Sequence, residues 1–265
     1  MKEALCIIGG SGFYDFLPSP QEKYVETPFS TDPIVLYHSK AENRDLYFLP
    51  RHGKGHSIPP HRINFKANIY ALHLLSVARV LSTSAVGSVQ EEIIPGTYVL
   101  LDQFIDFIRP ITFFEDNFSV KFPDRIELSG VIHTDMTNPY CTDLRRHISG
   151  VLSKFSHSRL NGTYYCAAGP RFETPAEIKA LQSLGADVVG MTNSSEAILC
   201  RELGICYSSI ALVTNFAAGL QQQVNHQEVI DLFNQRASEL KKILNDVIKV
   251  IPDEKSCSCR SHISK

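Results

Sequence analysis

The sequence contains no apolar run long enough to cross a bilayer and no charged-then-apolar leader after Met1. It also has little net charge, formally -2 at pH 7, which gives no reason to expect nucleic acid or a membrane surface as a partner. We therefore expect a cytoplasmic protein. With 265 residues, 43% of them hydrophobic and 20% charged, the chain can bury a large core.

Internal repeats, low-complexity runs and linkers are also absent. We therefore expect one domain over residues 1–252, followed by a polar C-terminal tail over residues 253–265. Short apolar segments typical of strands alternate with helical patterns from end to end, which predicts a layered α/β fold. The last helix is expected from Val229 to Ile251, because apolar residues recur there at helical spacing.

Seven cysteines are present, but their spacing contains neither CxxC pairs nor a zinc pattern of Cys and His, so no metal site is expected. Because a reducing compartment disfavours disulfides, cysteines in such a chain are usually buried thiols. Cys257 and Cys259 are the exception. They stand close together in the polar tail, where exposed thiols would be prone to oxidation unless paired.

A glycine-rich turn follows the first strand signal, which covers Ala4 to Ile8. Its run, Gly9-Gly10-Ser11-Gly12, lets backbone N–H groups face an anion without interference from a Cβ atom. The run differs from the dinucleotide fingerprint GxGxxG, and no crossover helix follows it. Phosphate, with Ser11 as hydroxyl donor, is therefore the better candidate ligand, and a tight turn without a ligand explains the segment equally well.

Two later strand ends also carry features of an anion site. The predicted strand Asp45–Pro50 runs into Arg51-His52-Gly53-Lys54-Gly55-His56, and Arg offers the planar donor fork that phosphate favours. An exposed basic loop is the alternative for this segment. The predicted strand Val80–Ser88 ends in small hydroxyl residues and a glycine, which would let a ligand approach the backbone closely.

The stretch Gly162–Leu220 carries the side chains around which the site prediction is organised. It contains a carboxylate at Glu173, a Gly-Met-Thr turn at Gly190–Thr192 and a strand-end amide at Asn215. Because ligands of α/β sheets bind outside the carboxyl ends of strands, we expect these groups to converge on one crevice. Such a pocket suits a small polar heterocycle with a sugar attached.

Two helices are expected to begin with capping boxes. Asn193 stands three residues before Glu196, and Asn225 stands three residues before Glu228. The second helix places His226 in its first turn, at the mouth of the sheet. The two asparagines are therefore predicted to cap their helices, with the two glutamates as their reciprocal partners.

Five motifs follow one another along nearly the whole chain. They are IIGGSGFYD, PRHGKGHSIPPHRINFKANIYAL, SAVGSVQEEIIPGTYVLLDQFIDF, AGPRFETPAEIKALQSLGADVVGMT and GICYSSIALVTN. Together they resemble the purine nucleoside phosphorylase and 5'-methylthioadenosine phosphorylase family. The resemblance implies a single three-layer αβα domain with a mixed central sheet, in a homotrimer or a dimer of trimers. It also implies phosphorolysis of an N-glycosidic bond to free purine and pentose 1-phosphate, with phosphate as co-substrate and no metal or organic cofactor.

The resemblance further implies roles for single residues. Phosphate contacts are expected from Ser11, Arg51, His52, Ser84, Ala85 through its backbone, and Thr192. Met191 is expected under the ribose and Phe172 beside the base. The chemistry agrees, because phosphate needs N–H, O–H and guanidinium donors, and a ribosyl cation tolerates a soft thioether better than a nearby positive charge.

The preference for a 6-oxopurine over adenine is predicted from two positions after the last core strand. The methylthioadenosine phosphorylase branch of the family has an Asp-x-Asp pair at these positions. This chain has Asn215-Phe216-Ala217 there, and a carboxamide can bond O6 and N7 of an oxopurine because it both donates and accepts. Glu173 matches a glutamate that accepts the N1 proton of an oxopurine, a proton that adenine lacks. His226 matches a histidine that bonds the ribose 5'-hydroxyl, although a solvated histidine is the alternative.

We therefore expect a purine nucleoside phosphorylase that cleaves inosine and guanosine in purine salvage, with Asn215 and Glu173 as catalytic residues. Phosphorolysis of S-methyl-5'-thioinosine or 5'-methylthioadenosine stays open, because the run Ala217-Ala218-Gly219 also resembles methylthioinosine phosphorylases. An inactive nucleoside-binding protein stays open as well. A dinucleotide-dependent oxidoreductase would rest on Gly9–Gly12 alone.

The Cys257-Ser258-Cys259 ending resembles that of heat-adapted archaeal members of the family, in which cysteines matching Cys141, Cys200 and Cys206 are bridged. This resemblance implies a Cys141–Cys206 disulfide and a link from Cys200 to the tail. The charged fraction of 20% argues the other way, because it is not typical of a hyperthermophile.

Overall fold

A large mixed sheet forms the centre of the computed structural model, which describes residues 2–10, 16–108, 110–116, 118–122, 126–261 and 263, without the side chain of His56. Within these residues the sheet has 11 strands, and its main path runs β10-β6-β13-β5-β1-β4-β3-β2. The parallel central strands are β1 (Ala4–Gly9), β4 (Arg44–Pro50), β5 (Val77–Ser88) and β13 (Cys206–Phe216). Their carboxyl ends therefore lie at the same edge of the sheet.

The other strands extend this parallel centre. On one side lie β2 (Gln21–Val25) and β3 (Ile34–Ala41), and on the other lie β6 (Tyr98–Leu100) and β10 (Ser158–Arg159). A branch consists of β7 (Gln103–Ile105), β11 (Thr163–Cys166) and β12 (Val188–Gly190), and β12 pairs antiparallel with the end of β5. A separate two-stranded sheet joins β8 (Val120–Lys121) to β9 (Glu127–Leu128).

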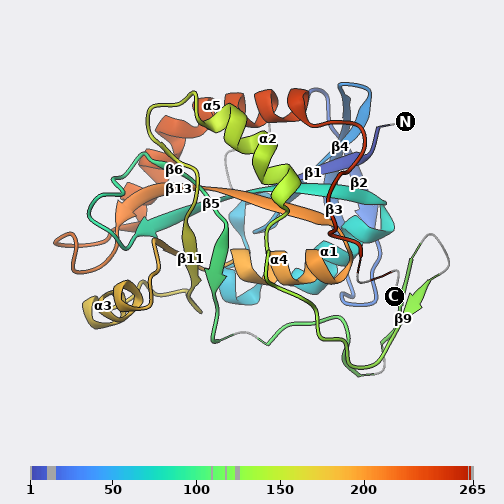
Figure 1. Cartoon of the computed structure of the whole chain (residues 1–265), viewed down its shortest axis with the longest axis horizontal. Helices are drawn as coiled ribbons and strands as arrows, with labels where there is room; N and C mark the ends of the chain where they lie inside the picture. Colours follow the sequence, from blue (N-terminus) through green and yellow to red (C-terminus); the bar gives the residue numbers. More distant parts are fainter. Residues whose placement is uncertain are drawn as a thin grey trace.

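Helices cover both faces of the sheet (Figure 1). One face carries α2 (Thr142–Leu152) and α5 (His226–Val250), and the other carries α1 (Phe65–Leu74) and α4 (Asn193–Glu202), while α3 (Pro175–Ser183) lies beyond β11. The short 3-10 helices η1 (Lys54–His56) and η2 (Pro60–Arg62) precede α1. In the described part of the chain, no helix is both long and apolar enough to span a membrane. The three layers confirm the predicted αβα fold.

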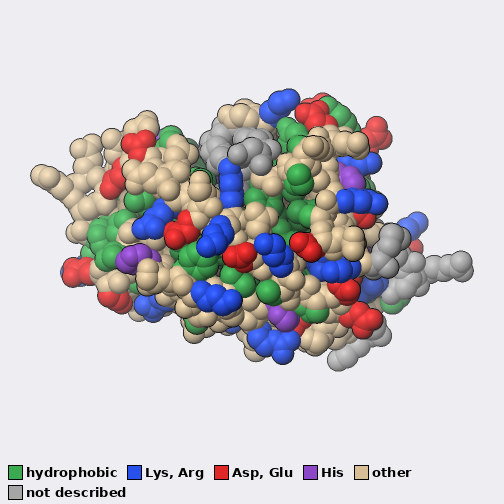
Figure 2. All heavy atoms as spheres, turned by 90° about the horizontal axis from the view of Figure 1, so that it is seen from above, with side chains coloured by type: hydrophobic (Ala, Val, Ile, Leu, Met, Phe, Trp, Pro, Cys, Tyr) green, Lys and Arg blue, Asp and Glu red, His purple; other side chains and the backbone are tan. Residues whose placement is uncertain are grey.

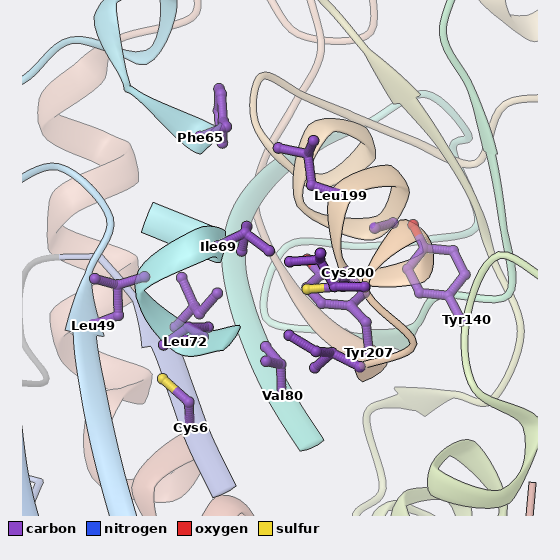
Figure 3. Packing of buried hydrophobic residues seen from close by; sticks show 14 of the residues in the cluster. Cys6, Leu49, Phe65, Ile69, Leu72, Val80, Tyr140, Leu199, Cys200 and Tyr207 are labelled. Carbon is purple, nitrogen blue, oxygen red and sulfur yellow. The ribbon is translucent and has the colours of Figure 1, made fainter. Parts of the chain in front are cut away.

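Hydrophobic side chains fill both spaces between sheet and helices. On the α1/α4 side, Ile69, Leu72 and Leu199 are buried with residues of the central strands, as Figure 3 shows. On the other side, Leu240 and Leu244 of α5 are buried in a second cluster with residues of α2 and β13. The outward face of this layer carries interspersed positive and negative side chains (Figure 2). The predicted closing helix is thus confirmed as an amphipathic helix packed on the sheet.

The tail that follows α5 contacts both layers of the molecule. Arg44 Nη2 donates to the carbonyl of Ile251 at 2.9 Å, and Arg79 Nη1 donates to the carbonyl of Pro252. Beyond these contacts the chain runs from the α5 side across to the α1 side (Figure 1). Cys259 is buried in the α2/α5 cluster, and Ile263 is buried in the α1/α4 cluster.

All seven cysteines are free thiols. The predicted link from Cys200 to the tail is wrong, because Cys200 belongs to the α1/α4 cluster, where it lies beside Tyr207 (Figure 3). The predicted Cys141–Cys206 disulfide is not formed either, although these two thiols are neighbours. They share a compact group with the tail cysteines, in which the sulfur atoms of Cys141, Cys206, Cys257 and Cys259 lie within 4.8 Å of one another.

Truncating Leu244 should test how much the fold depends on the α5 layer. Leu244 is completely buried, so Leu244→Ala removes packing atoms and leaves a cavity, and we expect it to lower the free energy of unfolding by about 2–5 kcal/mol. The matched control is Gln235→Ala on the exposed face of α5, which should change it by less than about 0.5 kcal/mol. Urea unfolding of both variants measures the difference, and equal losses would contradict the packing model.

Candidate active site

The predicted phosphate loops begin at the shared carboxyl edge of β1, β4 and β5. Gly9 at the end of β1 pairs with Pro50 at the end of β4, and the Arg51 N–H donates to the Gly9 carbonyl at 3.0 Å. On its other side, β1 pairs Ile8 with Ser82 of β5. The segments that follow β1 and β4 are therefore neighbours, and they lie beside the second half of β5, which continues to Ser88. Ser11, the predicted hydroxyl donor of the first loop, lies outside the described residues.

Arg51 is buried, with 3% of its surface exposed, and a network of acceptors holds its guanidinium. Nε and Nη2 donate to the two carboxylate oxygens of Glu196, Nη2 also donates to Ser82 Oγ at 2.7 Å, and Nη1 donates to the Thr83 carbonyl at 2.9 Å. These contacts use four of the five guanidinium N–H donors. Arg51 can therefore offer phosphate one N–H, whereas the sequence pattern predicted a two-point fork.

Glu196 is the buried counterion of this network. Its Oε2 accepts from Ser82 Oγ at 3.0 Å and from the Tyr207 hydroxyl at 2.8 Å, in addition to Arg51. The prediction that Glu196 completes a capping box with Asn193 is wrong. The N-cap residue of α4 is Thr192, which makes no side-chain cap. The Glu196 carboxylate neutralises a buried arginine instead of bonding the helix start.

Ser84 and Ala85 lie near the end of β5 with polar groups suited to a ligand. Ser84 is 7% exposed, and its Oγ has no hydrogen-bond partner among the described residues. Buried hydroxyls are almost always paired in proteins, so this unpaired one fits a donor kept for a bound anion. Ala85 is exposed, although it lies within β5, where it pairs with Leu212 of β13.

The Gly-Met-Thr turn lies beside this strand end. β12 pairs Val189 with Gly87 of β5, and the turn Gly190–Thr192 leads from β12 directly into α4. The Thr192 N–H donates to the Tyr164 hydroxyl at 3.1 Å, which fixes the backbone of the turn. Met191 lies against Gly169, where a Cβ atom would come within 2.5 Å of its sulfur, so a glycine is needed at that position.

The basic loop after β4 directs its side chains in different directions. His52 is half-buried and its Nδ1 lies 2.8 Å from the Ile58 carbonyl, which can only accept, so Nδ1 carries the proton. A phosphate contact through Nε2–H therefore requires the imidazolium form. Lys54 is exposed and pairs with Glu22 at 3.4 Å. Arg51 is the residue of this loop that enters the buried site.

Asn215 stands at the end of β13, opposite Gly87 of β5 and after an irregularity in the strand pairing. It is 4% exposed. Its Oδ1 accepts from Thr214 Oγ1 at 3.0 Å, and its Nδ2 donates to the Phe216 carbonyl at 2.9 Å. These bonds fix the orientation of the amide, and Nδ2 retains a second N–H that can donate to a ligand.

Glu173 precedes α3 and lies close to the Asn215 segment. The Thr174 hydroxyl and Glu177 form a capping box that begins α3, and Arg171 pairs with Glu177 at 2.7 Å. A Cβ atom at Gly219 would lie 3.0 Å from Pro175, so the turn after β13 packs against the start of α3. Partial burial of Glu173 raises its pKa above the ordinary value.

The residues predicted around the sugar and base lie near this junction. Met191 packs on a small hydrophobic cluster that includes the buried Ala217. Phe216 is half-buried, and Phe172 is 37% exposed. His226 is exposed in the first turn of α5. These positions bring together the two strand ends, β12 and β13, that the sequence pattern placed in one crevice.

Gln221 is a site residue that the sequence pattern did not reveal. Its Oε1 accepts from the Phe216 N–H at 2.9 Å, and its Nε2 donates to Glu228 at 3.0 Å. Gln221 therefore ties the Asn215 segment to the first turn of α5, where His226 lies. Glu228 binds Gln221, while Asn225 caps α5 by accepting from the Gln227 N–H, so only half of the second predicted capping box is observed.

A surface cavity of about 450 Å³ borders the site next to α4. Its lining includes His61, Ile108, Pro170 and Ser195 and none of the predicted site residues. Ser195 follows Thr192 by one turn of α4. The cavity therefore adjoins the predicted site and does not contain it.

Comparison with known proteins gives one consistent result. The family model described as "Phosphorylase superfamily" matches residues 4–249. A probable 6-oxopurine nucleoside phosphorylase of Thermococcus kodakarensis is 47% identical over 97% of this chain and 96% of its own length. An S-methyl-5'-thioadenosine phosphorylase of Nitrosopumilus maritimus is 40% identical over 96% of this chain and 94% of its own length. The structure of methylthioadenosine phosphorylase from Schistosoma mansoni with adenine has a TM-score of 0.85 and 32% identity, covering 99% of this chain and 96% of that one.

Removing the Glu196 carboxylate tests its role as the counterion of Arg51. Glu196→Gln leaves a buried guanidinium without its partner charge, and we expect the free energy of unfolding to fall by about 3–5 kcal/mol. Phosphate should restore part of this loss, because an anion at the site supplies negative charge near Arg51 and stabilises the state that binds it. Thermal unfolding with and without phosphate measures both effects.

The matched control is Glu202→Gln, which changes the other buried glutamate of α4. Glu202 accepts the Phe113 N–H at 2.8 Å and lies at the opposite end of the helix. Glu202→Gln should also lower the melting temperature. Phosphate should raise the melting temperature of this variant no more than it raises that of the unmodified protein. Equal rescue of both variants by phosphate would contradict a specific link between Glu196 and the anion site.

Proposed function

Because this chain belongs to the phosphorylase superfamily, we propose that it is a purine nucleoside phosphorylase that cleaves inosine and guanosine with phosphate. The observation that carries the proposal is Asn215, a buried and oriented amide with a spare N–H at the end of the last core strand. Two carboxylates at the positions of Asn215 and Ala217 would repel the O6 atom of an oxopurine. Several relatives named 6-oxopurine nucleoside phosphorylase support the same substrate class.

In this proposal phosphate binds at the carboxyl ends of β1, β4 and β5. The unpaired hydroxyl of Ser84, the remaining N–H of Arg51 and the hydroxyl of Thr192 donate to it, together with Ser11, His52 and the backbone of Ala85. Arg51 and Glu196 form a neutral pair, so the pocket binds the dianion mostly through placed dipoles. Such donors need no metal or organic cofactor for the reaction.

The base binds between the Glu173 segment and Asn215. Glu173 accepts the N1 proton of the oxopurine, and Asn215 Nδ2 donates to O6 or N7, while Phe172 and Phe216 flank the ring. An adenine ring would leave Glu173 without its proton, and an unpaired buried group costs about 1–3 kcal/mol. The two groups therefore select against a 6-amino purine from opposite edges of the ring.

The chemical step breaks the bond between C1' and N9 of the nucleoside. Negative charge then develops on the purine, where the Asn215 amide stabilises it at N7 and O6, and positive charge develops on the ribosyl group above the Met191 thioether. A phosphate oxygen attacks C1' and forms ribose 1-phosphate. The residues act by positioning the reactants and by electrostatic stabilisation of the developing charges. Electrostatic stabilisation usually contributes most to the rate in such sites.

His226 is proposed to bond the 5'-hydroxyl of the ribose, which favours inosine over S-methyl-5'-thioinosine. The second candidate function is phosphorolysis of a methylthio nucleoside, because relatives with those names are 38–40% identical and position 217 is alanine. The family resemblance also supports a cytoplasmic homotrimer or dimer of trimers, with neither nucleic acid nor membrane as a partner.

The substrate series inosine, guanosine, adenosine, methylthioadenosine and methylthioinosine tests the proposal with phosphate present. Inosine and guanosine should have the highest kcat/KM. Asn215→Ala should lower kcat for inosine by about 10²–10³-fold, the usual effect of losing one such donor. The control is Gln222→Ala, which changes an exposed residue in the loop after β13 and should leave kcat unchanged. Faster cleavage of adenosine or methylthioadenosine than of inosine would sink the oxopurine assignment.

The pH dependence of kcat/KM for inosine should report Glu173. Only the carboxylate accepts the N1 proton, so activity should fall as the pH drops through the raised pKa of Glu173, above the ordinary value of 4.5. Glu173→Gln should lower kcat/KM and remove this acid limb. Glu177→Gln is the matched control and should keep it, because Arg171 holds the pKa of Glu177 at about 2.

Stability should respond in the opposite sense. A folded-state pKa above the unfolded value means that Glu173 contributes stability below the unfolded pKa and that this contribution is lost as pH rises through the folded pKa. Glu173→Gln should therefore not lower the melting temperature at neutral pH. An acid limb that persists in Glu173→Gln would show that another group controls the profile.

A further inference from the structure

Four cysteine thiols converge at the end of the molecule away from the active site. Cys141 caps the start of α2, Cys206 begins β13, and Cys257 and Cys259 lie in the tail. Their sulfur atoms all lie within 4.8 Å of one another, and Cys206 and Cys257 approach to 3.2 Å. Three of the four are buried and Cys257 is half-buried, so the group is largely shielded from solvent.

The spacing of these sulfur atoms fits a tetrahedral cation. Four thiolates at about 2.3 Å from a zinc ion are about 3.8 Å apart from one another. This value lies between the 3.2 Å that separates Cys206 and Cys257 and the 4.8 Å within which all four sulfur atoms lie. Cys141 Sγ also accepts the Leu144 N–H at 3.4 Å, and it lies at the N-terminus of an 11-residue helix. A helix N-terminus and a backbone donor both favour a negatively charged sulfur.

We propose that Cys141, Cys206, Cys257 and Cys259 bind a structural Zn²⁺ ion. Four sulfurs that all lie within 4.8 Å of one another suit a shared cation, whereas two disulfides would need only separate pairs. Zinc is the redox-inert ion that prefers four thiolates, and phosphorolysis moves no electrons. The ion would bind to deprotonated thiols and release their protons to solvent.

The position of the site makes its role structural. Cys206 begins β13 and Asn215 lies nine residues along the same strand, so the two sites are about 30 Å apart at 3.3 Å per residue. The ligands come from the start of α2, from β13 and from the tail. These segments are also joined in this region by hydrophobic contacts, by the hydrogen bond from Ser256 Oγ to Asp143 and by the bond from the Cys141 N–H to the Tyr207 carbonyl. The ion would therefore fasten the tail to the domain, independently of the nucleoside site.

Metal analysis of the untagged protein, purified without reductant and without chelator, tests the proposal. Elemental analysis should find one zinc per chain, and thiol titration of the unreduced, denatured protein with chelator should find all seven thiols. Three free thiols would mean two disulfides and would overturn the proposal. Iron in place of zinc would overturn it too, as would failure of the reduced protein to retain added Zn²⁺ through gel filtration.

Serine variants locate the ligands. Cys257→Ser and Cys259→Ser should lose the zinc, and Cys200→Ser, a buried cysteine outside the cluster, should retain it. Both tail variants should fold, because they change the chain after α5, and they should keep the kcat of the unmodified protein. Retention of a full equivalent of zinc by Cys257→Ser and Cys259→Ser would exclude this site.

Two further measurements do not depend on variants. Cobalt exchanged into the protein should show the absorption of tetrahedral thiolate coordination, and an octahedral spectrum would contradict the proposal. A chelator should lower the melting temperature of the unmodified protein and leave that of Cys257→Ser unchanged. Equal shifts in both proteins would show that the chelator acts elsewhere.

Discussion

The buried ion pair between Arg51 and Glu196 is the interaction on which the active site depends. It joins the end of β4 to the inner face of α4, across 145 residues of sequence, and Ser82 and Tyr207 complete it from β5 and β13. Two desolvated charges are tolerated there because each is the partner of the other and because hydrogen bonds use four of the five N–H donors of Arg51. The pair therefore fixes where the Gly190–Thr192 turn lies relative to the strand ends. Any ligand at that edge meets a preorganised set of dipoles.

In the proposed function, selection of the base has a different physical origin from binding of phosphate. The Asn215 amide is oriented by Thr214 and by the Phe216 carbonyl, and the Glu173 segment is held in place by the packing of Gly219 against Pro175. Recognition therefore relies on the shape of two short segments, and Gln221 connects one of them to α5. Affinity for phosphate and choice of purine thus belong to separate parts of the fold.

Much of the fold follows from local sequence pattern, because buried strands and amphipathic helices can be identified from their composition and from the spacing of their hydrophobic residues. The closing helix and the strand ends at Pro50, Ser88 and Asn215 were predictable for that reason. Glu196 was not, since its spacing from Asn193 matches a local cap while its partner lies 145 residues away. The family resemblance placed Cys141 beside Cys206, but the spacing of the cysteines did not predict that Cys257 and Cys259 join them, because the four residues come from three distant segments and match no local metal motif. Gln221 lies in an irregular loop, where no regular spacing of residues indicates which side chains belong to the site.

The path of the tail has a consequence for how the chain folds during its synthesis. Ile263 fills a position in one hydrophobic layer and Cys259 a position in the other, so both layers are completed by residues that are made after α5. Strand β13, which pairs with the centre of the sheet, is also made late in translation. Domains of this size begin to fold from the N-terminus as they emerge, but both layers of this one lack part of their core until the segment after α5 has been made. Until then a nascent form exposes apolar surface on both faces of its sheet, the kind of surface that chaperones bind.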